Sequence, residues 1–250
     1  MESHDMQVLA NVLEDTKADA HTRRRLLQVA AGGTLALGAG GTPAWAAKGE
    51  SPRRILNSLA TAESFGVTFL TEAIKRAPGT PSAGLVETLK AANTAEYDHV
   101  VALRKLGGRQ FTLRFWIPDA AFGAGGFGLF ESIETADTVE LMGYLTGTTA
   151  FAKRGDERAA RFLAEGCAVE AEHRAIARFA QTALGGRQQI SIDRSFAPWS
   201  IKTVAGMIKA LEGAGIGFGE RGAEPGAFYT FPDDPVAGGV GLVNAGRKPV

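Results

Sequence analysis

The sequence predicts an all-α protein built as a four-helix bundle, with a long connection between its second and third helices. Four segments carry apolar residues at helical spacing, over residues 51–77, 82–106, 129–153 and 156–184. A short motif of an acid followed three residues later by a histidine falls on the second and on the fourth segment. An acid in the first segment and another in the third complete the pattern. The four helical segments leave little room for β-strands.

The first 46 residues are expected to form an export signal outside the folded domain. Arginines at 23–25 precede leucines at 26 and 27, and no charged residue occurs from 26 through 47. This Gly- and Ala-rich stretch ends in Ala44-Trp45-Ala46, a small-residue cleavage pattern. The alternative is a membrane anchor, which the many glycines disfavour. We therefore expect a twin-arginine signal peptide and a periplasmic or other extracytoplasmic location.

Composition and charge are those of an ordinary globular domain. Hydrophobic residues make up 45% and charged residues 22% of the 250 residues. The 27 basic residues balance the 27 acidic ones, so no nucleic acid or anionic membrane is indicated as the main partner. Cys167 is the sole cysteine. An internal disulfide is excluded, and the fold must depend on packing.

The first two predicted helices have clear start and stop signals. Ser51 and Pro52 are an N-cap followed by proline in the first turn, and Pro78-Gly79 ends the first helix. Glu63 lies among the apolar positions of this helix rather than on a plainly polar face. The second helix is expected from about residue 82 to residue 106, because Gly107-Gly108 follows it.

The remaining elements follow from loop length and composition. Residues 107 to about 128 are rich in aromatics and glycine and are too long for a tight turn, so they are expected to cross between two helix pairs, with a short extended piece at 115–117. The third and fourth helices are predicted at 129–153 and 156–184. A short fifth helix is expected near 199–211, before an irregular tail that packs on the bundle through its aromatics. The chain then divides into the signal (1–46), the bundle (47–186) and a C-terminal extension (187–250).

Acids and histidines form an internal repeat within these helices. The repeated set is Glu63, Glu96 and His99 in one half of the chain, and Asp137, Glu170 and His173 in the other. The first acid precedes the second by 33 residues in both halves (96 − 63 and 170 − 137), and one shift of 74 (137 − 63) relates all three positions. Residues three apart share a helix face, so each acid and its histidine can reach one point in the bundle interior.

Such a set has a chemical purpose as metal ligands. Acids inside a helical core are costly unless they are paired or bind a cation. Mixed oxygen and imidazole ligands suit iron or manganese. The predicted centre holds two such ions, with Glu96 and Glu170 as bridges, Glu63 and Asp137 as terminal carboxylates, and His99 and His173 as one imidazole per ion. The alternative is a structural bundle whose acids line a wet core.

Two further residues follow Asp137 on the same helix face. Glu140 lies one turn later and is either the ligand in place of Asp137 or an extra, movable carboxylate. Tyr144 lies another turn along, where it either contacts the metal site, through a hydrogen bond or as an electron donor, or is an ordinary, partly buried tyrosine, which is the interpretation we favour. Asp98 and Glu172 precede the two histidines and point about a quarter-turn away, so we interpret them as surface or supporting charges rather than ligands.

The ligand pattern of an acid and Glu-x-x-His, repeated, resembles the ferritin-like superfamily, which includes rubrerythrins, bacterioferritins and manganese catalases. Ala95-Glu96-Tyr97-Asp98-His99-Val100 and Ile117-Pro118-Asp119-Ala120-Ala121-Phe122 look more specifically like exported ferritin-like domain proteins of the desiccation-related type. The resemblance covers about residues 51–186 and departs at Asp137, where the superfamily usually has glutamate. No cysteine-rich rubredoxin segment is present, which excludes electron transfer through such a domain.

Three functions are consistent with these observations. The first is redox chemistry on peroxide or dioxygen at a di-iron or di-manganese centre, as in a peroxidase, catalase or oxidase. The second is metal binding without turnover, for storage or delivery. The third is a stress-related envelope protein that uses the bundle as a scaffold. The sequence does not choose between iron and manganese, and it fixes neither the electron donor nor the oligomeric state.

Overall fold

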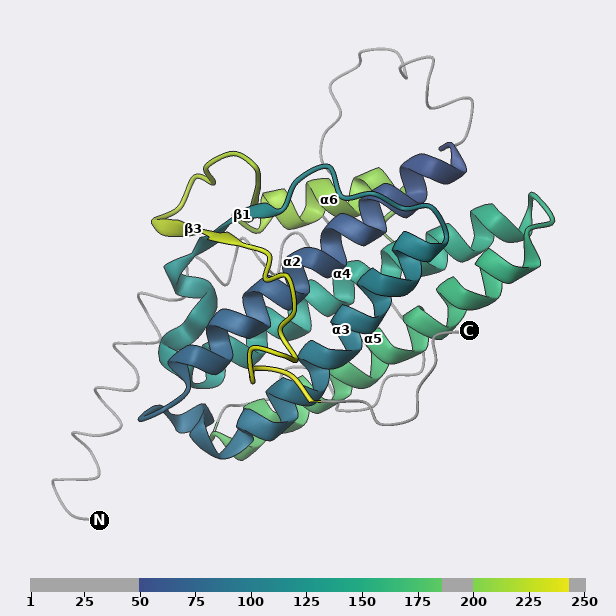
Figure 1. Cartoon of the computed structure of the whole chain (residues 1–250). Coiled ribbons are helices and arrows are strands. Elements are labelled where there is room, and N and C mark those ends of the chain that lie inside the picture. The colour runs from purple at the N-terminus through teal and green to yellow at the C-terminus, as the bar shows by residue number, and fades with distance from the viewer. Residues whose placement is uncertain (1–49, 186–199, 243–250) are drawn as a thin grey trace, which may run out of the picture.

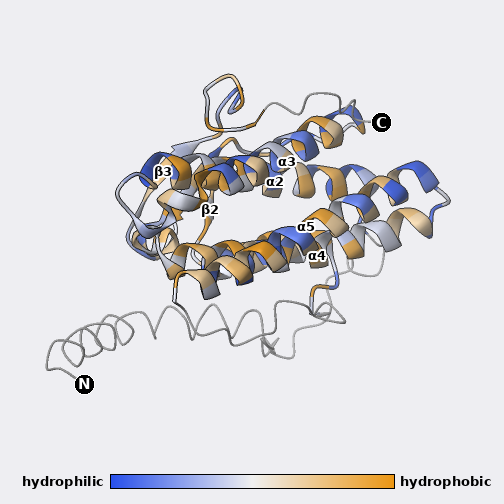
Figure 2. Cartoon of the chain, turned by 90° about the horizontal axis from the view of Figure 1, so that it is seen from below, coloured by the Kyte–Doolittle hydropathy of each residue, from blue (hydrophilic) through white to orange (hydrophobic). Residues whose placement is uncertain are grey.

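The computed structural model describes residues 50–185 and 200–242, and this part of the chain is mostly helical (Figure 1). The four long helices are α2 (Pro52–Arg76), α3 (Val86–Lys105), α4 (Phe127–Ala152) and α5 (Glu157–Ala183). Helix α2 packs on α3 and α4 packs on α5, and Figure 2 shows the two pairs on opposite sides of the bundle. A helical bundle is therefore confirmed. The predicted signal peptide lies outside the described residues.

The helices begin where the sequence provides caps. The Ser51 side chain accepts a hydrogen bond from the Arg54 amide at 3.3 Å, and Pro52 occupies the first turn. Asp156 caps α5 in the same way, by accepting from the Ala159 amide at 3.0 Å. The second predicted helix starts instead with a 3₁₀ turn, η1 (Pro81–Leu85), before α3 begins. All four long helices lie within a few residues of their predicted positions.

A small antiparallel sheet corrects the all-α prediction. Strands β1 (Arg114–Pro118), β2 (Gly217–Phe218) and β3 (Gly226–Thr230) lie in the order β2-β1-β3. Phe115 pairs with Phe218 on one side and with Tyr229 on the other. The extended piece predicted at 115–117 is confirmed, but the tail is not irregular throughout. Strand β2 has only two residues, and no residue of the five-residue β3 is fully buried, so neither shows an alternating pattern; both pair with the edges of β1.

The tail packs on the bundle through its aromatic rings, as predicted. Phe218 lies 6.1 Å from Phe65 of α2, measured between ring centroids. Phe231 stacks on Tyr97 of α3 at 6.4 Å. Another contact joins Tyr229 to Phe122 of the 3₁₀ segment η2 (Asp119–Gly125) at 6.0 Å. These rings from the C-terminal tail pack on rings from helices and loops much earlier in the chain, so the tail and the bundle share one hydrophobic core.

The short fifth helix predicted near 199–211 is confirmed as α6 (Val204–Gly213), which begins a few residues later and packs on α2 and α4. The carboxylate of Glu50 accepts hydrogen bonds from the Val204 and Ala205 amides, which satisfies the free amide groups at the start of α6. Met207 of α6 is fully buried against Gly143 of α4. None of the helices in the described ranges is long and apolar enough to cross a lipid bilayer.

Replacement of Gly143 is expected to destabilise the docking of α6. An added Cβ at this position would lie 2.2 Å from Met207 Sδ and 3.1 Å from its Cγ, so the fully buried Met207 side chain, or α6 with it, would have to shift. We expect Gly143→Ala to lower the free energy of unfolding by about 1–3 kcal/mol. The control Gly84→Ala, where a Cβ meets no atom within 4 Å, should change it by less than about 1 kcal/mol. Urea denaturation measures both, and equal effects would contradict the prediction.

Candidate metal centre

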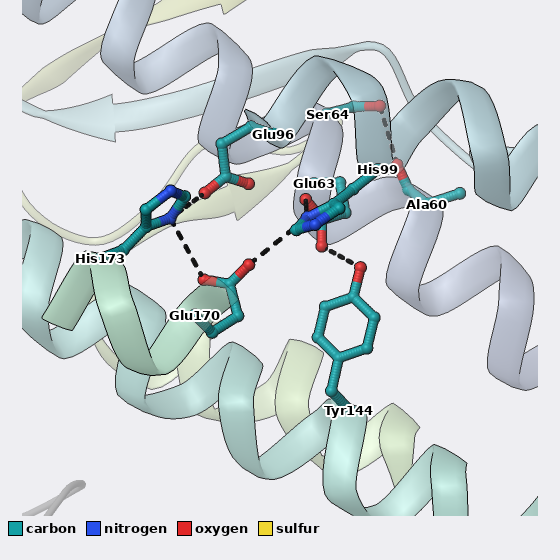
Figure 3. Close-up of polar contacts among 8 residues, drawn as sticks. All are labelled: Ala60, Glu63, Ser64, Glu96, His99, Tyr144, Glu170 and His173. Atoms are coloured by element: carbon teal, nitrogen blue, oxygen red, sulfur yellow. Dashed lines mark hydrogen bonds and ion pairs between the residues drawn. The ribbon is translucent and has the colours of Figure 1, made fainter. Parts of the chain in front are cut away.

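Every long helix contributes polar side chains to one buried point between the two helix pairs (Figure 3). The contributed residues are Glu63 from α2, Glu96 and His99 from α3, Asp137 and Glu140 from α4, and Glu170 and His173 from α5. None of the seven is more than 8% exposed. The two Glu-x-x-His motifs face each other across the bundle because each pair lies on the inner face of its helix.

The ligand atoms form two groups of four that share two glutamates. One group is Glu63, Glu96, His99 and Glu170, and the other is Glu96, Asp137, Glu170 and His173. Within each group, one ligand atom from every residue lies within 4.8 Å of the others. That spread is about twice a metal–ligand bond of about 2.0–2.4 Å, so each group can surround one cation. Glu96 and Glu170 belong to both groups, the position of a bridge.

The histidines face the carboxylates through their Nδ1 atoms. His99 Nδ1 lies 3.2 Å from Glu63 Oε2, and His173 Nδ1 lies 3.1 Å from Glu96 Oε1. Glu170 is placed between both rings, with one oxygen 3.6 Å from His99 Nδ1 and the other 3.8 Å from His173 Nδ1. Each histidine is nearest to an acid from another helix: His99 of α3 to Glu63 of the adjacent α2, and His173 of α5 to Glu96 of α3 across the bundle.

Burial of so many acids shifts their titration strongly. Burial holds the pKa values of Glu63, Asp137 and Glu140 well above the usual carboxyl range, and the negative charges of Glu96 and Glu170 add to the shift. Without a metal, these groups favour their protonated forms. The set therefore has a high affinity for positive charge, whether protons or cations supply it.

The pKa values of Glu170 and His173 shift in the directions expected for an ion pair. Burial raises the pKa of Glu170, but hydrogen bonding and positive charge from His173 and His99 outweigh it and lower that pKa to about 2. The separations of 3.6 and 3.8 Å exceed hydrogen-bond distances, so we attribute the shift mainly to charge. Burial lowers the pKa of His173, but Glu170 and Glu96 more than reverse this and raise it well above its ordinary value.

The donor set fits a metal because its oxygens lack other partners. Five buried carboxylate oxygens make no hydrogen bond to the protein: Glu96 Oε2, Asp137 Oδ2, Glu140 Oε1 and both oxygens of Glu170. Buried polar atoms are rarely left in this state without a ligand, ion or water. Gly66 of α2 makes room for one of them, since a Cβ there would lie 2.8 Å from Glu96 Oε2.

Tyr144 of α4 supports the first group from outside. Its hydroxyl donates a hydrogen bond to Glu63 Oε1, and its ring lies edge-on to His99 with 5.9 Å between centroids. The side chain is fully buried, and Gly166 of α5 leaves space for the ring, because a Cβ there would lie 2.6 Å from Tyr144 Cε1. Of the two alternatives for this tyrosine, contact with the candidate site is confirmed.

Loss of the Tyr144 hydroxyl is expected to weaken metal binding without removing a ligand. In Tyr144→Phe, Glu63 loses the donor that fixes its orientation, and such supporting hydrogen bonds are worth about 10–100-fold in metal affinity. Tyr97→Phe is the matched control, because that hydroxyl bonds to the Asp233 carbonyl at 3.2 Å, away from the centre. Competition with a chromophoric chelator measures both affinities. Equal affinities for the two variants would contradict a supporting role for Tyr144.

Metal binding is expected to release protons. Glu63, Asp137 and Glu140 have raised pKa values and favour the protonated form, whereas a metal requires the carboxylate, so each cation displaces protons. The apparent affinity should then rise with pH across neutrality. A metal titration in weakly buffered solution with a pH indicator measures the release. An affinity that stays constant or rises as pH falls would contradict the shifts.

The structure divides the seven predicted ligands into those inside and those outside the two groups, and it shows two further residues at the site. Six of the seven candidates fall in the two groups, while Glu140 lies outside both and lines an adjacent cavity. Sequence reasoning missed Gly66 as a contact of Glu96. It also missed Arg174, which is 4% exposed and whose positive charge acts to lower the pKa of Asp137. Arg174 follows His173 directly, and its buried charge carries no signal in the sequence pattern.

Comparisons of the chain with known protein families, with curated proteins and with solved structures give no match. The comparisons assign no function, and the structural observation that bears on function is the buried carboxylate and histidine cluster. In the described residues, this cluster could hold a metal.

Proposed function

We propose that this chain is a ferritin-like dimetal protein that performs redox chemistry on peroxide or dioxygen. The observation that carries the proposal is the pair of four-residue groups that share Glu96 and Glu170. Four helices supply the ligands in the order acid, Glu-x-x-His, acid, Glu-x-x-His, which is the arrangement of carboxylate-bridged dimetal bundles. The sequence resemblance to exported ferritin-like domain proteins supports the same assignment.

The residues present would hold iron or manganese. Glu63 and His99 would bind one ion, Asp137 and His173 the other, and Glu96 and Glu170 both; oxygen and imidazole ligands of this kind suit either metal. When bound, such a metal pair would supply electrons to dioxygen or peroxide, and would take electrons back from a separate donor or from peroxide acting as a reductant. The protein orients Glu63 through the Tyr144 hydroxyl and buries the side chains that would hold the ions.

We further propose that the chain acts outside the cytoplasmic membrane. The arginines at 23–25 and the Ala44-Trp45-Ala46 segment support export through the twin-arginine route. This route moves folded proteins, which suits a centre whose ligands come from four helices.

Metal analysis of the purified protein tests the proposed centre. The wild-type chain should carry close to two equivalents of iron or manganese, and the Glu96→Ala/Glu170→Ala variant should carry none, because it removes both shared ligands. A matched control is Glu87→Ala/Glu165→Ala, which removes two exposed acids from the same two helices. Mass spectrometry of the metals reads all three samples. A wild-type protein that takes up no metal, even after anaerobic reconstitution, would overturn the proposal.

A further inference from the structure

A cavity of about 400 Å³ reaches one side of the candidate centre from the protein surface. Its inner end is formed by Glu96, Asp137, Glu140 and His173, all of which are buried. Glu63, His99 and Glu170 do not line it. The cavity therefore reaches Asp137 and His173 of one group, together with the shared Glu96, and does not reach Glu63 or His99 of the other.

The mouth of the cavity lies between α3 and α5. Ala92 and Ala95 of α3 are partly exposed on one side of it, and Ile176 of α5 is 45% exposed on the other. Small side chains on α3 keep the entrance open where larger ones would close it. A molecule that enters here passes between the two helix pairs that Figure 2 shows on opposite sides of the bundle.

Most of the cavity wall is apolar. Phe65 and Phe69 of α2, Leu89 of α3, and Phe130 and Ile133 of α4 lie between the mouth and the acidic inner end. A cavity of this volume is within the range of about 300–1,000 Å³ that small-molecule sites occupy, and such sites combine apolar walls with a few polar groups. An ion or a peroxide molecule needs neither this volume nor this wall.

Charge restricts the class of molecule further. None of the residues that line this cavity is a lysine or an arginine, and Glu172 at the rim adds a negative charge to the acids inside. The one imidazole in the lining, His173, already pairs with Glu96 at 3.1 Å, so an entering anion would find no free positive charge among the lining residues. Glu140 Oε1 and Asp137 Oδ2 are buried at the inner end without a hydrogen-bond partner, so a polar atom of an entering molecule can bond to them.

We propose that this cavity binds a neutral, largely apolar organic molecule whose one polar end lies at Asp137 and Glu140. Its role as a substrate of the metal centre rests on the function proposed above, but its binding does not. The ligand class follows from the apolar wall, the absence of lysine and arginine from the lining, and the unpartnered acids at the inner end. The two groups differ in their access to the cavity. Apart from the shared Glu96, the cavity is lined by ligands of the group with the shorter Asp137 side chain and by none of the other group.

Dye binding to the purified full-length protein tests the cavity. The neutral dye prodan becomes more fluorescent in apolar surroundings, and anilinonaphthalene sulfonate is an anionic dye of similar size. Ala92→Trp and Thr88→Trp each add a large ring at a partly exposed lining position of α3, one and two turns before Glu96, and neither replaces a ligand. Ala164→Trp makes the same kind of change at an exposed position of α5 outside the cavity. Circular dichroism melting confirms folding, and the metal content of every sample is measured separately.

The wild-type protein and Ala164→Trp should bind prodan saturably at one site. Both mouth variants, and the anionic dye on the wild type, should bind at least about tenfold more weakly. Equal binding by folded mouth variants, or preference for the anionic dye, would overturn the proposal. Phe179 is 60% exposed and lies one turn after Ile176 on α5. If the protein is a dimer that binds no dye, and Phe179→Ser separates the two copies, then a second copy covers the mouth and the proposal is overturned. Dye binding without metal uptake would contradict the dimetal function alone, and metal uptake without dye binding would contradict the cavity alone.

Discussion

Metal removal is expected to destabilise the protein strongly at neutral pH. The core holds five acids that are no more than 5% exposed, and five of their oxygens have no partner in the protein. A cation that binds only the folded state adds about 4 kcal/mol when its free concentration is about 1,000 times Kd. Thermal unfolding with and without a chelator measures the difference. We expect the chelated sample to melt at a clearly lower temperature.

The stability lost on metal removal should depend on pH with a definite sign. Glu63, Asp137 and Glu140 have folded-state pKa values well above the ordinary carboxyl value of about 4. Their protonation stabilises the metal-free fold at low pH, and this contribution is lost as the pH rises through the raised values. His173 acts in the same direction, since its pKa is also raised. Glu170, with a pKa of about 2, contributes constantly in this range.

The metal-free protein should therefore lose stability from about pH 5 to about pH 8, while the metal-loaded protein should lose less. The gap between their melting temperatures should widen over the same interval. A metal-free protein whose stability stays constant or rises in this interval would contradict the shifts. It would point to a core in which water already satisfies the acids.

The repeat of acids and histidines made the site predictable from the sequence. Glu96 and His99 lie three residues apart on one helix, and Glu170 and His173 repeat the spacing, so helical geometry alone brings each pair to one face. The acids of α2 and α4 follow from the constant shift. Which of Asp137 and Glu140 joins the group stayed open, because both lie on the same face of one helix. The three-dimensional packing places Asp137 with Glu170 and His173 and leaves Glu140 in the cavity wall.

The features that could not be predicted depend on contacts between distant segments. Strand β1 pairs with β2 and β3 from the far end of the chain, and neither partner is long enough to show a period of its own. Gly66 looks like any small helix residue until Glu96 of α3 packs against it. The cavity likewise results from small residues on α3 opposite Ile176 of α5, which no single segment reveals.

The two ions of the proposed centre should differ in access to solvent. Asp137 and His173 line the cavity, whereas Glu63 and His99 do not line it and lie beside the buried Tyr144. A chelator should therefore remove one ion quickly and the other slowly from the same protein. This difference gives each histidine a distinct effect when it is replaced.

Replacement of one histidine at a time is expected to halve the metal content. His99 belongs only to the first group and His173 only to the second, so His99→Gln and His173→Gln should each retain close to one equivalent. The ion that remains in His99→Gln should be removed quickly by a chelator, because it faces the cavity, and the ion in His173→Gln slowly. Glu140→Gln is the control and should keep both ions, since Glu140 belongs to neither group. If either histidine variant loses all its metal, the centre holds a single shared ion and the two-ion assignment is wrong.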